Sequence, residues 1–241
     1  GSFVAEGLCR LFLAYPGTRI VLVDHDVVEP HNLLRQCFFA GDVGRPKAQV
    51  LAERLTERYE RPVGFSLRPV MAAAPASLGY RMPSRMFGSN FSETPGLLIS
   101  CVDNAAARRA LGQRDGMSFI APWWIDAGNS DHWGQVLIGN YRPPHNSEPE
   151  EYARRKPFRE DPGLVSLLPA PTLQQPDLLV QSEAPRAPDC AQEVQAGQQS
   201  PVINQAMAAL TLEVVRQLTS GACRWMGLYV SLPDGMLRPV W

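Results

Sequence analysis

The stretch from Arg19 to Leu55, RIVLVDHDVVEPHNLLRQCFFAGDVGRPKAQVLAERL, constrains the fold more than any other part of the chain. Its first residues, Arg19 to Val23, form a short apolar run that Asp24-His25-Asp26 ends, which is typical of a buried strand. Apolar residues at helical spacing then predict a helix from Arg45 to Glu60. A buried strand that leads to a helix in this way favours an α/β fold.

The polar residues of this stretch predict a nucleotide site. A carboxylate at the tip of such a strand, here Asp24, can accept a hydrogen bond from a ribose hydroxyl. The polar side chains that follow suit a polyphosphate better than a nicotinamide, and they are Asn32, Arg35, Gln36 and Lys47.

Four sequence blocks together resemble one known family, the ThiF/MoeB/HesA family of bacterial relatives of ubiquitin-activating enzymes. The wording is most similar to the ThiF-family protein of the plasmid-borne PRTRC cassette. The blocks are D-H-D-V-V-E-P-H-N-L-L-R-Q with D-V-G-R-P-K-A, S-C-V-D-N-A-A-A-R at Ser100 to Arg108, W-I-D-A-G-N-S-D-H-W-G-Q-V at Trp124 to Val136, and D-C-A-Q-E-V at Asp189 to Val194.

This resemblance implies a Rossmann-like α/β domain, in which a mixed sheet is flanked by helices. It also implies an ATP- and Mg²⁺-dependent adenylyltransferase that activates the C-terminal glycine of a ubiquitin-like or sulfur-carrier-like protein. Such an enzyme is expected to be a cytoplasmic homodimer, and a ubiquitin-conjugating-enzyme-like protein is a further expected partner.

The apolar spacing of Phe3, Leu8, Leu11 and Phe12 predicts a first helix that ends before Pro16-Gly17. In the resembled family, a strand and a G-x-G-G-x-G-S loop precede this helix. Gly1-Ser2 look like the last residues of that loop, because S-F-V-A-E-G-L continues the family pattern. We therefore expect residues 1–241 to be a single adenylation domain that is truncated at its N-terminus and lacks its first strand. Gly1 and Ser2 are then expected in the nucleotide site. The alternative is a Gly-Ser cloning scar.

Adenylation joins a carboxylate to the α-phosphate of ATP, so the site must neutralise charge. The resemblance and the residue types assign phosphate neutralisation to Arg35 and Lys47, and hydrogen-bonding support to Asn32 and Gln36. Asp103, at the end of a predicted strand, is the expected Mg²⁺ ligand, and Asn104 beside it is also expected in the nucleotide site. Taken singly, Asp103 could be only a helix N-cap, and the two cations could be a solvated face.

Cys190 is the one thiol with a chemical argument. It lies just before a long predicted helix whose dipole would stabilise a thiolate. In ThiF-like relatives, a cysteine in the matching block can take the activated carrier, so Cys190 is a candidate catalytic nucleophile. A buried, incidental cysteine is an equal alternative. His25 and His31 lack the spacing of a metal site.

Composition excludes several classes of protein. The 23 basic residues nearly balance the 24 acidic residues, which argues against a nucleic-acid partner. The five cysteines form no C-x-x-C pair, so we expect neither a disulfide framework nor the zinc site of many relatives. No apolar run is long enough to predict a membrane span.

Further elements follow from periodicity. Strands are expected at 63–70, 96–102, 123–127 and 133–141, helices at 105–112 and 201–218, and a closing hairpin at 226–240. Residues 71–95 read as a loop. Residues 142–190 hold ten of the 22 prolines and are expected to form a crossing loop.

Three other functions stay open at this point. A dinucleotide-dependent oxidoreductase would use the same sheet and Asp24 for NAD, but it leaves Arg35 and Lys47 unexplained. A catalytically inactive scaffold subunit should have lost its phosphate ligands, whereas the visible ones are present here. A tRNA-modifying relative fits poorly with the near-neutral charge.

Overall fold

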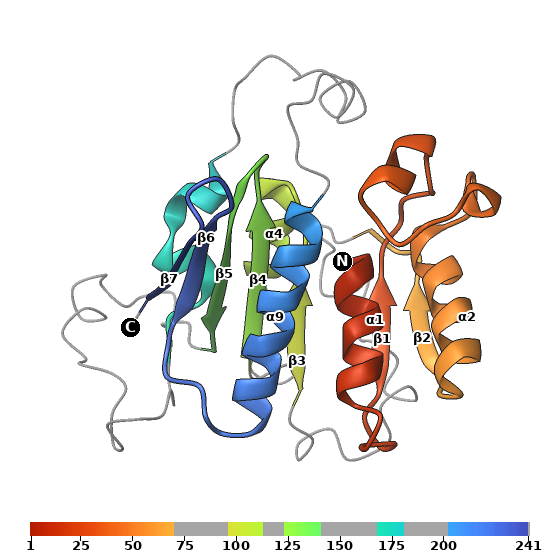
Figure 1. The fold of residues 1–241 in the computed structure, drawn as a ribbon, viewed down its shortest axis with the longest axis horizontal. Coiled ribbons are helices and arrows are strands. Elements are labelled where there is room, and N and C mark those ends of the chain that lie inside the picture. The colour runs from red at the N-terminus through yellow and green to blue at the C-terminus, as the bar shows by residue number, and fades with distance from the viewer. Residues whose placement is uncertain (70–95, 113–122, 141–167, 181–201, 241) are drawn as a thin grey trace, which may run out of the picture.

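The computed structural model describes residues 1–69, 96–112, 123–140, 168–180 and 202–240. Within them, two sheets lie side by side (Figure 1). One sheet pairs β1 (Ile20–Val23) with β2 (Val63–Ser66) in parallel. The other has five strands in the order β3-β4-β5-β6-β7.

The five-stranded sheet is mixed. Strand β3 runs parallel to β4, whereas β4, β5, β6 and β7 are successively antiparallel. This arrangement, with helices on both faces, confirms the predicted α/β class. The strands are β3 (Leu97–Ser100), β4 (Trp123–Asn129), β5 (Trp133–Gly139), β6 (Gly227–Ser231) and β7 (Met236–Val240).

Helices α1 (Ser2–Leu11) and α9 (Ile203–Thr219) pack against each other on one face (Figure 1). Helix α2 (Lys47–Tyr59) packs on β1 and β2, and α4 (Ala105–Gly112) lies on the opposite face of the larger sheet from α9. No helix in these ranges is long and apolar enough to cross a membrane.

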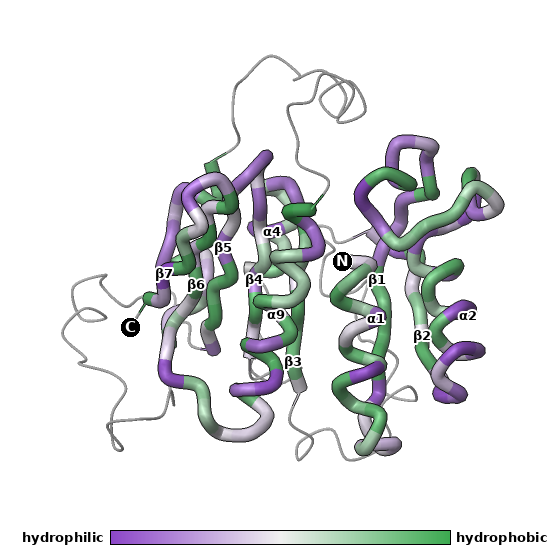
Figure 2. Tube along the Cα trace, viewed as in Figure 1, coloured by the Kyte–Doolittle hydropathy of each residue, from purple (hydrophilic) through white to green (hydrophobic). Residues whose placement is uncertain are grey.

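The main core lies between α9 and the larger sheet. Alternation along the strands sends Ile125, Val136 and Ile138 toward α9, where Val214 and Val215 are fully buried. Trp124 points to the other face and packs on Leu111 of α4. In Figure 2, β1 and β3 carry the hydrophobic colour along most of their length.

Several short helices were not predicted. Two 3₁₀ helices, η1 (Pro30–Leu34) and η2 (Ala40–Asp42), lie between β1 and α2. Two more, α7 (Pro171–Gln174) and η4 (Pro176–Leu179), lie inside the predicted crossing loop. Four-residue helices carry no readable periodicity, but proline at their first turn favours them. The predicted loop at 71–95 and most of the crossing loop lie outside the described residues.

Strands β1 and β3 are the facing edges of the two sheets, and no strand pairing joins them in the described ranges. Helix α1 bridges the two halves, since it packs on α2 and β1 as well as on α9. Its N-cap, Gly1, lies beside Cys101, just after β3, and the chain returns from the other end of α1 to the start of β1. The carboxyl ends of β1 and β3 therefore point the same way.

Candidate functional site

A cavity of about 1980 Å³ separates β1 from β3. Apolar residues of both strands line its length, and polar residues gather where the strands end. Among the described part of the chain, every residue predicted for the site lines this cavity except Asn32. The lining set comprises Gly1, Ser2, Asp24, Arg35, Gln36, Lys47, Asp103 and Asn104. Cys190 lies outside the described residues.

At the carboxyl end of β1, an acidic turn meets the start of α2. The Asp24 carboxylate accepts a hydrogen bond from the backbone N–H of Asp26 at 2.9 Å. Lys47 Nζ lies 3.1 Å from Asp26 Oδ2, and the Lys47 backbone N–H donates to the Asp26 carbonyl. These bonds hold the lysine side chain, which is only 14% exposed, at the cavity wall. Burial raises the pKa of Asp24 above its usual value, and the nearby Lys47 charge opposes this shift.

Ligand atoms of Asp24, His25 and Asp26 lie within 4.8 Å of one another. Two of these side chains are exposed, and Asp26 already contacts the Lys47 ammonium group. A salt-bridged exposed acid is common in proteins without a metal, so this cluster gives no separate argument for an ion.

Helix η1 carries Arg35 and Gln36 toward the cavity from its end. Asn32 is 2% exposed, and its side-chain oxygen accepts a hydrogen bond from the Glu29 backbone N–H at 3.0 Å. The structure thus gives Asn32 a part in forming the turn, and Asn32 is not one of the residues that line the cavity. The Arg35 carbonyl accepts a hydrogen bond from Asn204 in the first turn of α9.

The start of α1 also lines the cavity. Gly1 is its N-cap, and the Ser2 hydroxyl accepts a hydrogen bond from the Cys37 backbone N–H at 3.0 Å. The Ser2 side chain is buried, and its hydrogen bond with Cys37 ties the start of α1 to the segment that follows η1. The free backbone N–H groups of a helix N-terminus attract anions, as a phosphate site requires.

At the carboxyl end of β3, Asp103 and Asn104 are both exposed toward the cavity. Asn104 caps α4, because its side-chain oxygen accepts a hydrogen bond from the Ala107 backbone N–H at 2.8 Å. Its amide nitrogen lies 3.2 Å from Asp103 Oδ1. The N-cap role that was the alternative for Asp103 therefore belongs to Asn104. The Asp103 carboxylate lies at the cavity wall.

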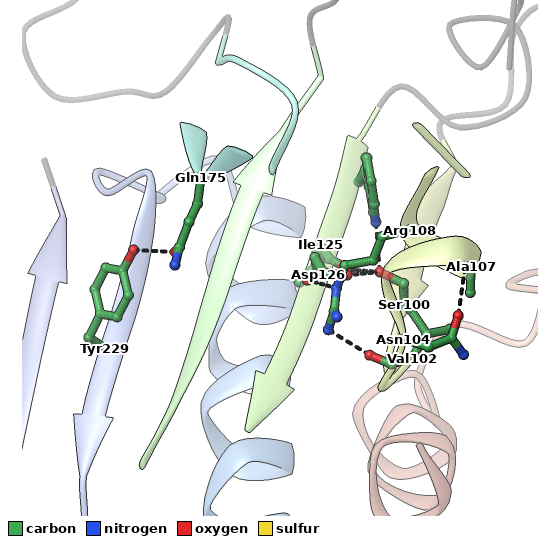
Figure 3. Close-up of polar contacts among 10 residues, drawn as sticks. Ser100, Val102, Asn104, Ala107, Arg108, Ile125, Asp126, Gln175 and Tyr229 are labelled. Carbon is green, nitrogen blue, oxygen red and sulfur yellow. Dashed lines mark hydrogen bonds and ion pairs between the residues drawn. The ribbon is translucent and has the colours of Figure 1, made fainter. Parts of the chain in front are cut away.

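A buried polar network that the sequence reasoning missed joins β3, β4 and α4 (Figure 3). Asp126, on β4, is fully buried and pairs with Arg108 of α4 at 3.0 Å. Its carboxylate also accepts a hydrogen bond from Ser100, whose oxygen accepts one from the Trp124 indole. Burial raises the pKa of Asp126, and the Arg108 charge and the Ser100 hydroxyl act against this rise. The sequence did hold one signal of this network, namely an aspartate inside an apolar strand, because a buried carboxylate needs hydrogen-bonding or charged partners.

Gln135 on β5 is a second residue that the sequence reasoning passed over. It is 5% exposed, it lines the cavity, and it faces Gly128 across the β4–β5 pair. Further from the cavity, the Tyr229 hydroxyl donates to Gln175 at 2.8 Å (Figure 3), which joins β6 to the segment between α7 and η4.

The comparisons with known proteins concern the family and the fold of the chain. Residues 1–218 match the ThiF family model. Among solved structures, the chain is similar to PaaA, with a TM-score of 0.56 and 17% identity over 99% of this chain and 69% of that one. It is also similar to E. coli MccB, solved with succinimide, with a TM-score of 0.53 and 13% identity over 97% of this chain and 59% of that one.

At such identities the structural matches establish only the fold. The chain spans 69% of the length of PaaA and 59% of the length of MccB. No curated protein sequence matches. The family match, by contrast, covers nearly the whole sequence and includes every described site residue. The chain belongs to the ThiF family.

Proposed function

We propose that this protein adenylates the C-terminal carboxylate of a ubiquitin-like or sulfur-carrier-like protein at the expense of ATP. The observation that carries the proposal is the convergence of cations and acids on one cavity from three distant segments. Arg35 and Lys47 come from one side, Asp103 from the other, and the start of α1 lies between them. A polyphosphate needs this combination, whereas a nicotinamide does not.

Two structural neighbours support a nucleotide and a peptide substrate. E. coli MccB has been solved with AMPCPP and MccA, and that structure matches with a TM-score of 0.51 and 13% identity over 99% of this chain and 60% of that one. Another MccB structure, with a variant described as MccA-N7isoASN, matches with a TM-score of 0.55 and 13% identity over 99% of this chain and 61% of that one. An E1-like adenylation activity is the general function that this similarity and the family support.

The donor set at the cavity fits Mg²⁺ bound with ATP. Mg²⁺ prefers one or two carboxylates together with phosphate oxygens, and Asp103 offers an exposed carboxylate on the wall opposite Lys47. When bound, the ion would supply positive charge against the phosphate oxygens. Asp103 would hold it, with Asn104 as the immediate neighbour of that carboxylate.

In the proposed reaction, a carboxylate oxygen of the carrier attacks the α-phosphorus of ATP. The bond between the α-phosphorus and the bridging oxygen breaks, and pyrophosphate leaves with the electron pair. No general base is required, because the attacking carboxylate is already ionised. The task of Arg35 and Lys47 is to offset the charge of the approaching anions, while Asp24 holds the ribose and Gln36 supports the phosphates.

Some parts of the proposal concern steps after adenylation. Transfer of the activated carrier to the Cys190 thiol is one such step, and Cys190→Ser should then abolish the covalent carrier–enzyme adduct. A homodimer and a ubiquitin-conjugating-enzyme-like partner in the cytoplasm, within a PRTRC system, complete the proposal by family resemblance. Neither a nucleic-acid partner nor a zinc ion forms part of it.

The test is ATP–pyrophosphate exchange, with and without the candidate carrier protein. Carrier-dependent exchange would support adenylation. Tight ATP binding without exchange would overturn the proposal in favour of a nucleotide-binding scaffold, and retention on an NAD matrix without ATP binding would favour an oxidoreductase.

A further inference from the structure

We propose that Arg108 is a positioning residue for Mg²⁺–ATP, because it fixes the strand end that presents Asp103 to the cavity. This inference rests on the proposed function. It assigns a task to the buried ion pair between α4 and β4, which the reaction itself does not use.

The guanidinium group of Arg108 holds two different acceptors at once. Arg108 Nε lies 3.0 and 3.3 Å from the two oxygens of Asp126, while Nη2 donates to the Val102 carbonyl at 2.5 Å (Figure 3). The Val102 carbonyl belongs to the peptide group that enters Asp103. Holding that oxygen therefore sets the orientation of the peptide from which the Asp103 side chain projects.

The partner that anchors Arg108, the Asp126 carboxylate, is held rigidly. Asp126 is fully buried in the middle of the sheet, and Arg108 is 8% exposed. Ser100 and Trp124 hold the same carboxylate through a chain of hydrogen bonds, so the anchor includes both β3 and β4. A planar guanidinium group can serve two acceptors at fixed angles, whereas an ammonium group cannot reproduce this geometry.

Gly128 leaves room for the Arg108 guanidinium group because it has no side chain. A Cβ at this position would lie 2.9 Å from Arg108 Nη2, the nitrogen that holds Val102. Gly128→Ala would therefore displace the guanidinium group while leaving its charge in the protein. This gives a second and milder way to disturb the same contact.

The experiment measures ATP affinity by calorimetry, with and without Mg²⁺, in the whole chain. In the unaltered protein, Mg²⁺ should tighten ATP binding. Arg108→Lys should lose about tenfold or more of that tightening, because groups that orient a metal ligand typically contribute 10- to 100-fold to metal affinity. ATP affinity without Mg²⁺ should stay within about twofold, since the other phosphate contacts are intact. Gly128→Ala should show the same pattern with a smaller loss.

The matched control is Arg109→Lys, the neighbouring arginine on the same helix, which donates to the Leu179 carbonyl instead. It should keep the full effect of Mg²⁺. Asp103→Asn should lose the effect, and the double variant Asp103→Asn with Arg108→Lys should lose no more, because both act through one carboxylate.

Three results would overturn the inference in distinguishable ways. If Arg108→Lys and Gly128→Ala both keep the Mg²⁺ effect, Arg108 does not position the ligand, and the proposed function stands. If Asp103→Asn keeps the effect, Asp103 is not the ligand, and both the inference and the metal assignment fail. If the unaltered protein does not bind ATP, the proposed function itself fails. Should Arg108→Lys not fold, Gly128→Ala decides the question.

Discussion

The carboxyl ends of β1 and β3 present aspartates to the same cavity, yet they are held in opposite ways. At the end of β1, Asp26 is 53% exposed, and its partner Lys47, the first residue of α2, is 14% exposed. At the end of β3, the exposed Asp103 is backed by an ion pair that is almost completely buried. Exposed pairs are weak and exchange partners easily, whereas a buried pair is costly to break. The β1 end is therefore suited to rearrange around a ligand, and the β3 end is suited to stay fixed.

The largest expected effect tests this contrast directly through stability. Asp126→Asn leaves the Arg108 charge buried without a counterion, so it should lower the free energy of unfolding by about 3–5 kcal/mol. Asp26→Asn should change it by less than about 1 kcal/mol, because the Asp26 carboxylate is half exposed and solvent weakens its interaction with Lys47. Urea unfolding of both variants measures the difference. Equal losses would end the distinction between the two strand ends.

The second prediction concerns activity at the β1 end. Lys47→Ala and Arg35→Ala should each lower ATP–pyrophosphate exchange by about 10²-fold or more, because each removes a preorganised positive charge from the proposed phosphate site. The control is Arg45→Ala, a cation near Lys47 that pairs with Glu53 and does not line the cavity. Its exchange rate should equal that of the unaltered protein, and an equal loss there would point to a general charge effect.

A third, intermediate effect is expected at Ser100. Its hydroxyl group donates to Asp126 and accepts from the Trp124 indole, so Ser100→Ala leaves two buried polar groups with one partner fewer. We expect a loss of about 1–3 kcal/mol in urea unfolding. Ser66→Ala, at the end of β2, provides the matched comparison in the other sheet. There the hydroxyl accepts a long hydrogen bond of 3.4 Å from the Arg68 backbone N–H at an exposed position. A loss there as large as at Ser100 would contradict the contrast.

The smallest expected effect is a pH dependence at Asp24. Burial raises the pKa of Asp24 in the folded state, so its protonated form favours folding. Its contribution to stability is complete below the ordinary pKa of an aspartate and is lost as the pH rises through the raised value. Asp24→Asn should therefore stabilise the protein slightly at neutral pH, by about 0.5 kcal/mol or less, and not at all in acid. Urea unfolding at several pH values measures this, and destabilisation at neutral pH would contradict it.

The strand ends could be predicted from the sequence because an apolar run that stops at an acid is a local signal. Asp24 and Asp103 were found in this way, and the structure brings both to the cavity that Arg35 and Lys47 also line. The strands and long helices were predicted for the same reason, with differences of a few residues at their ends, such as β2, which ends at Ser66.

The support behind Asp103 could not be predicted, because it depends on contacts between segments. Nothing local in the sequence indicates that Arg108 reaches both Asp126 and the Val102 carbonyl. Asn32 differs, because its inward orientation depends on a local turn in which its side-chain oxygen accepts a hydrogen bond from the Glu29 backbone N–H, and the sequence reasoning did not recognise that turn. The short helices α7 and η4 pack on the sheet and on α4, and their stability comes from that packing rather than from their own sequence.

The facing edges of β1 and β3 have a consequence for handling the protein. Each strand pairs on one side only in the described part of the chain, with β2 and with β4 respectively. The other side of each offers a row of backbone N–H and C=O groups that an extended segment can join, and apolar side chains such as Leu22 and Ile99 accompany it. Open edges of this kind promote self-association.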